Sequence, residues 1–125
     1  MKSRAVAFLL LLLIVAHLDA AMTRRIRFQR GHTSAEVVGR FNSKVTENLF
    51  VIHASKGQHM KVEIKPRTAN LITAGTVDSP SGKSDGGPGG VIFDSDLIET
   101  GDYKIRVFER QQNLPGSFAL RVEIK

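Results

Sequence analysis

The feature that most constrains the fold of this chain is the alternation of apolar and polar residues in short runs. Residues 118–124 show it best, because every second position there is apolar (Phe118, Leu120, Val122 and Ile124). Successive side chains of an extended chain point to opposite faces, so a period of two predicts a strand with one buried face. Residues 103–107 repeat the pattern.

Further segments have the same extended character, and none after residue 21 has a helical period. They are residues 26–28, 35–41, 50–54, 60–64, 70–77 and 91–93. About eight short strands, spaced about ten residues apart, predict an all-β protein: a single antiparallel β-sandwich or jelly-roll-like domain. Residues 78–90 are predicted to form a loop, because they are too rich in Gly and Pro for a strand ladder.

A Gly-Asp-Tyr sequence opens the strand at residues 103–107. Gly101 permits a sharp corner, and Asp102 is common in such turns. A Tyr at this place can bury its ring and return its hydroxyl to a backbone group, as in the tyrosine corner of β-sandwiches. The alternative for Tyr103 is an ordinary half-buried strand residue after a tight turn.

The first 20 residues have the composition of an export signal. Lys2 and Arg4 precede an unbroken apolar run over residues 5–15, and small residues follow. This order predicts a secretory signal peptide over residues 1–20 and a β-sandwich over residues 21–125, with an uncleaved anchor as the alternative. The protein is therefore expected to be periplasmic or secreted, without stable membrane insertion once the signal is removed.

The chain has no Cys, and its net charge is +6. The absence of Cys excludes disulfides, cysteine catalysis and thiolate zinc sites, so the domain must be stable through packing alone. A basic exported protein favours anionic partners such as envelope polymers, lipid head groups or an acidic cleft. Nucleic acid is not expected, because the basic residues are scattered along strands and export removes that ligand.

No motif in the sequence predicts phosphate or cation binding. Gly82, Lys83 and Ser84 resemble the end of a phosphate-binding loop, but Val77 stands where that loop needs Gly and no helix follows. Four acidic residues near the Gly-rich segment have no spacing of a Ca²⁺ loop and are predicted to be solvated (Asp78, Asp85, Asp94 and Asp96).

Catalytic patterns are missing as well. His32, His53 and His59 lack the spacing of a zinc motif, and no Gly-x-Ser-x-Gly nucleophile sequence occurs. We therefore predict a protein that is not an enzyme, with no catalytic residues, no metal site and no cofactor.

Four segments carry a resemblance to a known family. Residues 26–39, 50–60, 100–107 and 118–124 resemble, in this order, the bacterial periplasmic inhibitors of goose-type (g-type) lysozyme. The similarity includes an apolar strand before a Gly-His-Thr-Ser turn, an aromatic and apolar strand before Gly-Gln, and the Gly-Asp-Tyr-x-Ile-Arg-Val strand. The wider pre-peptidase C-terminal-like sandwich domains share this pattern.

The resemblance implies a secreted, non-catalytic β-sandwich that inserts a loop into the active-site cleft of a lysozyme. In the family the loop after the Tyr strand carries Arg residues, and here this loop is residues 109–116. The predicted partner-binding residues are therefore Arg110, Gln111, Gln112 and Asn113. Arg110 lies one place earlier than the first Arg of the family, and the second Arg has no counterpart.

The sequence is compatible with three other interpretations. Arg110 can be a solvent-facing loop residue, and the connection at residues 42–48 is a second candidate surface, although it lacks aromatic anchors. The protein can also be a generic secreted binding or accessory module that contacts envelope polymers or another exported protein. An enzyme is the third alternative, although no set of nucleophile, base and oxyanion donor is apparent.

Overall fold

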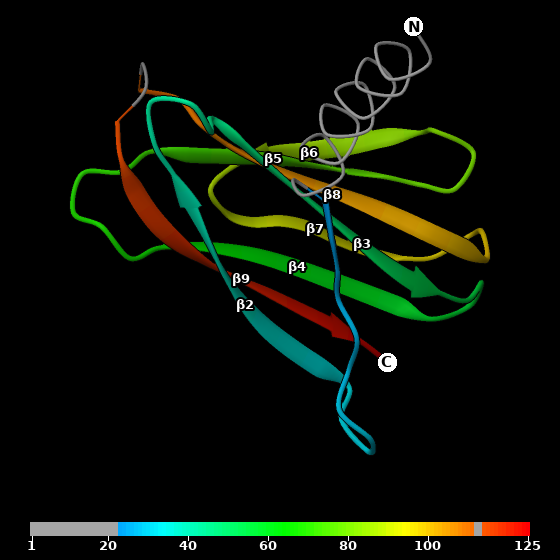
Figure 1. Ribbon diagram of the computed structural model, residues 1–125. Helices are drawn as coiled ribbons and strands as arrows, with labels where there is room; N and C mark the ends of the chain where they lie inside the picture. The colour runs from blue at the N-terminus through cyan, green and yellow to red at the C-terminus, as the bar shows by residue number, and fades with distance from the viewer. Residues whose placement is uncertain (1–22, 112–113) are drawn as a thin grey trace, which may run out of the picture.

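The computed structural model describes residues 23–111 and 114–125, which form a sandwich of nine strands (Figure 1). The strands are β1 (Thr23–Arg25), β2 (Ser34–Phe41), β3 (Glu47–Ala54), β4 (His59–Pro66), β5 (Thr73–Asp78), β6 (Ser84–Pro88), β7 (Gly90–Asp96), β8 (Gly101–Glu109) and β9 (Gly116–Ile124). One sheet has the order β1-β3-β8-β5-β6 and the other β2-β9-β4-β7. The predicted β-sandwich is confirmed, with nine strands instead of about eight.

Neighbouring strands are antiparallel, apart from β1, which runs parallel to β3. The predicted signal peptide lies outside the described residues. Within the part of the chain that is described, no helix is both long and apolar enough to cross a membrane.

The core lies between the two sheets and is built by the alternating faces that the sequence shows. Its largest side chains are at most 1% exposed and come from both sheets, among them Phe50, Met60, Ile64, Ile105 and Phe118. Alternation therefore predicted the buried face of each long strand correctly, because a strand between a core and solvent buries every second side chain.

The predicted tyrosine corner is present. The Tyr103 side chain is 2% exposed, and its hydroxyl donates a hydrogen bond of 2.7 Å to the backbone carbonyl of Glu99. Burial raises the pKa of Tyr103 above its ordinary value, because an ionised phenolate would lose hydration. Gly101 has a φ of 148°, which glycine adopts readily. Its lack of a side chain lets β8 begin directly beside Pro80, because a Cβ atom there would lie 2.9 Å from the Pro80 ring.

The prediction of a loop over residues 78–90 was wrong. Residues 84–88 form β6, which pairs with β5 from Asp78↔Ser84 to Ala74↔Pro88. The strand lies at the edge of its sheet, where a Pro without an N–H group disturbs no second neighbour. Composition alone hides such a strand, because the backbone makes the pairing and the side chains contribute little.

Two strand boundaries were also wrong. The first strand is Thr23–Arg25 instead of residues 26–28; Ile26 still donates its N–H to the Val51 carbonyl at 2.8 Å, and the ladder ends there. Residues 70–77 begin as a turn, with Asn70 at φ 64°, and the strand starts at Thr73. In both places the sequence pattern predicts which side chains are buried. It does not predict which backbone groups form the hydrogen bonds of the sheet.

Candidate protein-binding surface

Three connections of the chain meet at one end of the sandwich (Figure 1). They are residues 42–46 between β2 and β3, 67–72 between β4 and β5, and, between β8 and β9, the described residues 110, 111, 114 and 115 of the 110–115 connection. Backbone hydrogen bonds link them: Arg110 donates to the Ile72 carbonyl at 2.9 Å, Arg67 donates to the Ser117 carbonyl at 2.8 Å, and Glu109 donates to the Thr46 carbonyl at 3.4 Å. We call these three connections the loop end.

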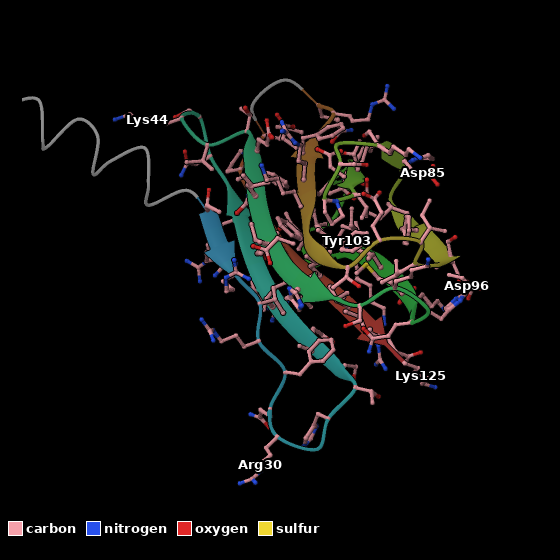
Figure 2. All side chains as sticks on the ribbon, turned by 90° about the vertical axis from the view of Figure 1, so that its right-hand side faces the viewer. Arg30, Lys44, Asp85, Asp96, Tyr103 and Lys125 are labelled. Atoms are coloured by element: carbon pink, nitrogen blue, oxygen red, sulfur yellow. The ribbon has the colours of Figure 1, made fainter. Side chains whose placement is uncertain are left out.

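The connection between β2 and β3 is shaped by its first residue. The side-chain oxygen of Asn42 accepts hydrogen bonds from the backbone N–H groups of Lys44 (2.8 Å) and Val45 (2.9 Å). Asn commonly folds the following backbone in this way. The turn carries Lys44 outward into solvent (Figure 2).

The connection between β4 and β5 is tied to the start of β9. The Thr68 hydroxyl oxygen accepts a hydrogen bond of 3.0 Å from the Ser117 N–H group, and the Thr68 carbonyl accepts one from Leu71 at 3.3 Å. Asn70 tolerates the positive φ of this turn better than most residues. The chain then leaves Ile72 51% exposed, beside Arg110.

The predicted binding residues of the 110–115 connection differ in their placement. The Arg110 side chain is exposed. Gln111 is half-buried; its N–H donates to the Glu109 carboxylate at 3.0 Å, and its side-chain oxygen is enclosed without a hydrogen bond from the described residues. Gln112 and Asn113 lie outside the described residues.

The loop end presents three exposed cations. Lys44, Arg67 and Arg110 form no ion pair with any residue that the structure describes. Glu47, at the start of β3, is paired with Arg106 at 3.5 Å on the adjoining sheet face. The surface therefore offers unpaired positive charge to an approaching carboxylate.

Exposed apolar groups accompany these cations. Leu114 is 45% exposed and lies on the same connection as Arg110. Ile72, whose carbonyl accepts the Arg110 N–H, is 51% exposed. Arginine beside apolar groups is a combination that protein–protein interfaces favour. The arrangement is suited to bind an acidic and partly apolar protein surface.

Solved structures with the same arrangement of strands include two periplasmic inhibitors. PliG of Aeromonas hydrophila, a periplasmic inhibitor of g-type lysozyme, has a TM-score of 0.68 and 22% identity, over 83% of this chain and 96% of that one. PliG of Salmonella Typhimurium has a TM-score of 0.65 and 17% identity, over 82% and 97%. The chain shares the fold of these inhibitors.

The same fold occurs in a domain of a different protein. The pre-peptidase C-terminal domain of a Bacillus anthracis collagenase has a TM-score of 0.56 and 10% identity, over 82% of this chain and 94% of that one. No family model and no curated protein sequence matches the chain. The likeness to these proteins is therefore a likeness of fold.

Sequence reasoning missed part of this surface. It named Arg110 and gave the 42–48 connection as a second candidate, but it assigned Arg67 to no surface. It placed Ile72 in a strand, and it gave Leu114 no role within the 109–116 loop. The one local signal was Pro66, which marks the end of β4 and the start of an exposed turn.

The residues that resemble phosphate-binding or cation-binding motifs have structural roles. Gly82 and Lys83 lie in the hairpin turn between β5 and β6, where Ser79 donates its N–H to the Lys83 carbonyl at 2.8 Å. Asp78 forms an ion pair with Arg106 at 3.3 Å. No group of three or more His, Cys, Asp or Glu side chains in the described residues could hold a metal ion.

The four acidic residues that were predicted to be solvated loop carboxylates all lie on strands. Asp94 and Asp96 on β7 remain exposed and contact His59. The Nδ1 atom of His59 lies 2.7 Å from Asp96, and its Nε2 atom lies 2.5 Å from Asp94. Carboxylates only accept hydrogen bonds when ionised, so this geometry suits an imidazolium that donates with both nitrogens. The hydrogen bond to Asp96 contributes most and the one to Asp94 next, and together they raise the pKa of His59 above its ordinary value.

This contact predicts a pH-dependent contribution to stability. The His59 pKa is higher in the folded state than in the unfolded chain, so its contribution is complete below about pH 6.5 and is lost as pH rises through the folded pKa. We expect His59→Gln to lower the free energy of unfolding near pH 6 and to have a much smaller effect near pH 9. Urea unfolding of both proteins across this range measures the difference.

Asp94→Asn supplies the matched control, because it removes one carboxylate and keeps the histidine. It should reduce the same pH dependence without abolishing it, since Asp96 remains. A stability difference between wild type and His59→Gln that is constant from pH 6 to pH 9 would contradict the assignment.

Proposed function

We propose that this protein is an exported, non-catalytic inhibitor of a goose-type lysozyme, acting in the periplasm or outside the cell. The observation that carries the proposal is the exposed, unpaired Arg110 on the loop end of a sandwich that shares its fold with two periplasmic lysozyme inhibitors. Export through a signal peptide over residues 1–20 is part of the proposal.

The mechanism rests on charge and shape at the loop end. Glycoside hydrolases act through carboxyl groups placed in a cleft. A guanidinium can bind such a carboxylate through two parallel hydrogen bonds, and exclusion of water strengthens the pair when its geometry is good. In the proposed complex Arg110 enters the cleft, and Gln112 and Asn113 contact its wall.

The neighbouring residues have supporting roles in this mechanism. The hydrogen bond from the Arg110 N–H group to Ile72 fixes the base of the loop, which lowers the entropy lost on binding. Gln111 is half-buried with its side-chain oxygen enclosed, and in the proposed complex its exposed part contacts the partner beside Arg110. Lys44 and Arg67 flank the insertion and contact acidic groups at the rim, while Ile72 and Leu114 exclude water.

The decisive experiment is the lysis of peptidoglycan by goose-type lysozyme with purified protein titrated in, and with chicken-type and invertebrate-type enzymes alongside. We expect selective inhibition of the goose-type enzyme. Arg110→Ala should weaken inhibition by about tenfold or more, since a desolvated charge-assisted pair contributes roughly 1.5–3 kcal/mol. Arg121→Ala, the same change on the outer face of β9, should leave inhibition unchanged.

Two results would contradict the proposal at different levels. Unchanged inhibition by Arg110→Ala would remove Arg110 from the mechanism while leaving the inhibitor function. No inhibition of any of the three lysozymes by the wild-type protein would remove the function itself and favour an accessory module with another exported partner.

A further inference from the structure

A cationic hollow lies away from the loop end, where the N-terminal arm leaves the five-stranded sheet. We use the term arm for residues 23–33. The hollow has a volume of about 250 Å³ and is lined by Arg25, Ile26, Arg27, Phe28, Ile52 and His53. The tip of the arm carries Arg30, at the opposite end of the molecule from Lys44 (Figure 2).

The wall of the hollow that the arm supplies is fixed to the sheet. β1 pairs with β3 from Thr23↔Leu49 to Arg25↔Val51, and Ile26 adds one further backbone hydrogen bond to Val51. Arg24 donates to the Val38 carbonyl at 2.6 Å and lies 5.0 Å from the centre of the Phe50 ring. The hollow is therefore preformed, which limits the entropy lost when a ligand binds.

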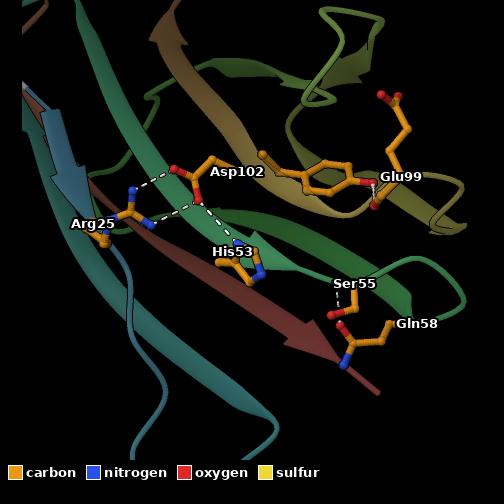
Figure 3. A network of polar contacts seen from close by, with 7 residues as sticks. Arg25, His53, Ser55, Gln58, Glu99 and Asp102 are labelled. Carbon is orange, nitrogen blue, oxygen red and sulfur yellow. Dashed lines mark hydrogen bonds and ion pairs between the residues drawn. The ribbon is translucent and has the colours of Figure 1, made fainter.

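The charge in this hollow is positive. Asp102 is the acidic group beside it, and Arg25 neutralises it through two hydrogen bonds of 2.7 and 3.1 Å (Figure 3). The hydrogen bond from Arg25 also holds the pKa of Asp102 below its ordinary value, so Asp102 stays ionised and paired with Arg25. Arg27 makes no ion pair or hydrogen bond with the described residues, and the sequence has no acidic residue between positions 23 and 35.

The floor of the hollow is apolar. Ile26 and Ile52 are buried, and Phe28 is half-buried against the core. His53 stands on the opposite wall, with its Nδ1 atom 3.6 Å from Asp102 (Figure 3). A free guanidinium, an imidazole and an apolar floor meet here within one small volume.

We propose that this hollow binds an oxyanion attached to an apolar group, with the phosphate or carboxylate on Arg27 and His53 and the apolar part on Phe28. Guanidinium groups bind both kinds of oxyanion through paired hydrogen bonds. The apolar floor distinguishes such a ligand from a bare anion, because burying alkyl carbon against it adds affinity that inorganic phosphate lacks. The site is independent of the proposed lysozyme inhibition, since it lies at the other end of the sandwich.

The test uses inorganic phosphate and hexyl phosphate as probes, titrated into the ¹⁵N-labelled protein at constant ionic strength. We expect both to shift the resonances of Arg27, Phe28 and His53. Hexyl phosphate should bind about tenfold more tightly, as burial of one or two methylene groups predicts. A parallel titration with phosphatidylglycerol vesicles distinguishes a lipid surface from a soluble source of the same chemistry.

Arg27→Gln and Arg30→Gln form a matched pair, because both remove one positive charge from the arm and only Arg27 lines the hollow. We expect Arg27→Gln to weaken hexyl phosphate binding about tenfold and Arg30→Gln to leave it within about twofold. Phe28→Ala should bring the affinity for hexyl phosphate close to that for inorganic phosphate.

Either of two results would overturn the proposal. The first is equal affinity for the two phosphates in the wild-type protein. The second is an equal loss of affinity in Arg27→Gln and Arg30→Gln, which would mean that the arm attracts anions only through diffuse charge.

Discussion

Phe118→Ala is expected to lower the free energy of unfolding by about 3–5 kcal/mol, the cost typical of removing a fully buried aromatic ring. The Phe118 ring is 0% exposed and stacks on Phe41 at 5.1 Å between centroids. It also meets Phe50 of the opposite sheet edge-on, with centroids 6.2 Å apart. Because the Phe118 ring contacts rings from both sheets, its removal weakens the packing between the sheets. Urea unfolding measures the change.

The matched control is Phe93→Ala, which removes the same ring from a half-buried position on β7. It should cost no more than about half as much, because less apolar surface is buried there. If Phe118→Ala does not fold, Phe118→Leu gives a smaller loss of the same origin. Equal losses at positions 118 and 93 would contradict the central role of the Phe118 ring.

Gly86→Ala should destabilise the protein by about 1–3 kcal/mol, as overpacking typically does. A Cβ atom at Gly86 would lie very close to the carbonyl oxygen of Gly75 and 2.7 Å from the Cα atom of Thr76. Both are backbone atoms of the neighbouring strand β5, so neither can rotate away. The expected consequence is that β6 separates from β5, which hydrogen exchange of the β6 amides would detect as faster exchange.

Gly87→Ala is the matched control on the same strand. A Cβ atom there would meet nothing within 4 Å. We expect this variant to be neutral or more stable by about 0.4–1 kcal/mol, because alanine restricts the unfolded chain more than glycine does. Equal stability of the two variants would show that the close approach of β6 to β5 is not required.

These two changes test different parts of the architecture. Phe118 holds the sheets together through side chains, whereas Gly86 allows an edge strand to pair through backbone alone. Neither residue lies in the loop end that is proposed to bind lysozyme or in the hollow of the arm. Their variants therefore measure the scaffold separately from either binding proposal.

Most long strands could be predicted from the sequence, because the core needs an apolar side chain at every second position. The tyrosine corner was predictable for a related reason, since a buried Tyr must find a partner for its hydroxyl and a turn supplies carbonyl groups nearby. β6 was not predictable in the same way. Its side chains bury little, and its strand conformation depends on the exposed edge of β5.

The candidate binding surface could also be predicted from the sequence only in part. Arg110 could be named because it stands in the loop after the Tyr strand, at a place that the family resemblance marks. Lys44 and Arg67 could not be assigned to the same surface, because they are far from Arg110 in sequence and meet it only through the order of strands.

The sequence by itself determined the fold class, the buried face of each long strand and the one loop arginine, because these depend on local alternation and turn chemistry. Only the tertiary structure decided which loops share an end, that His59 binds Asp94 and Asp96, and that Arg25 neutralises Asp102 beside an unpaired Arg27. The physical reason is strand pairing. Hydrogen bonds between distant strands set these neighbours, and no local pattern along the chain records them.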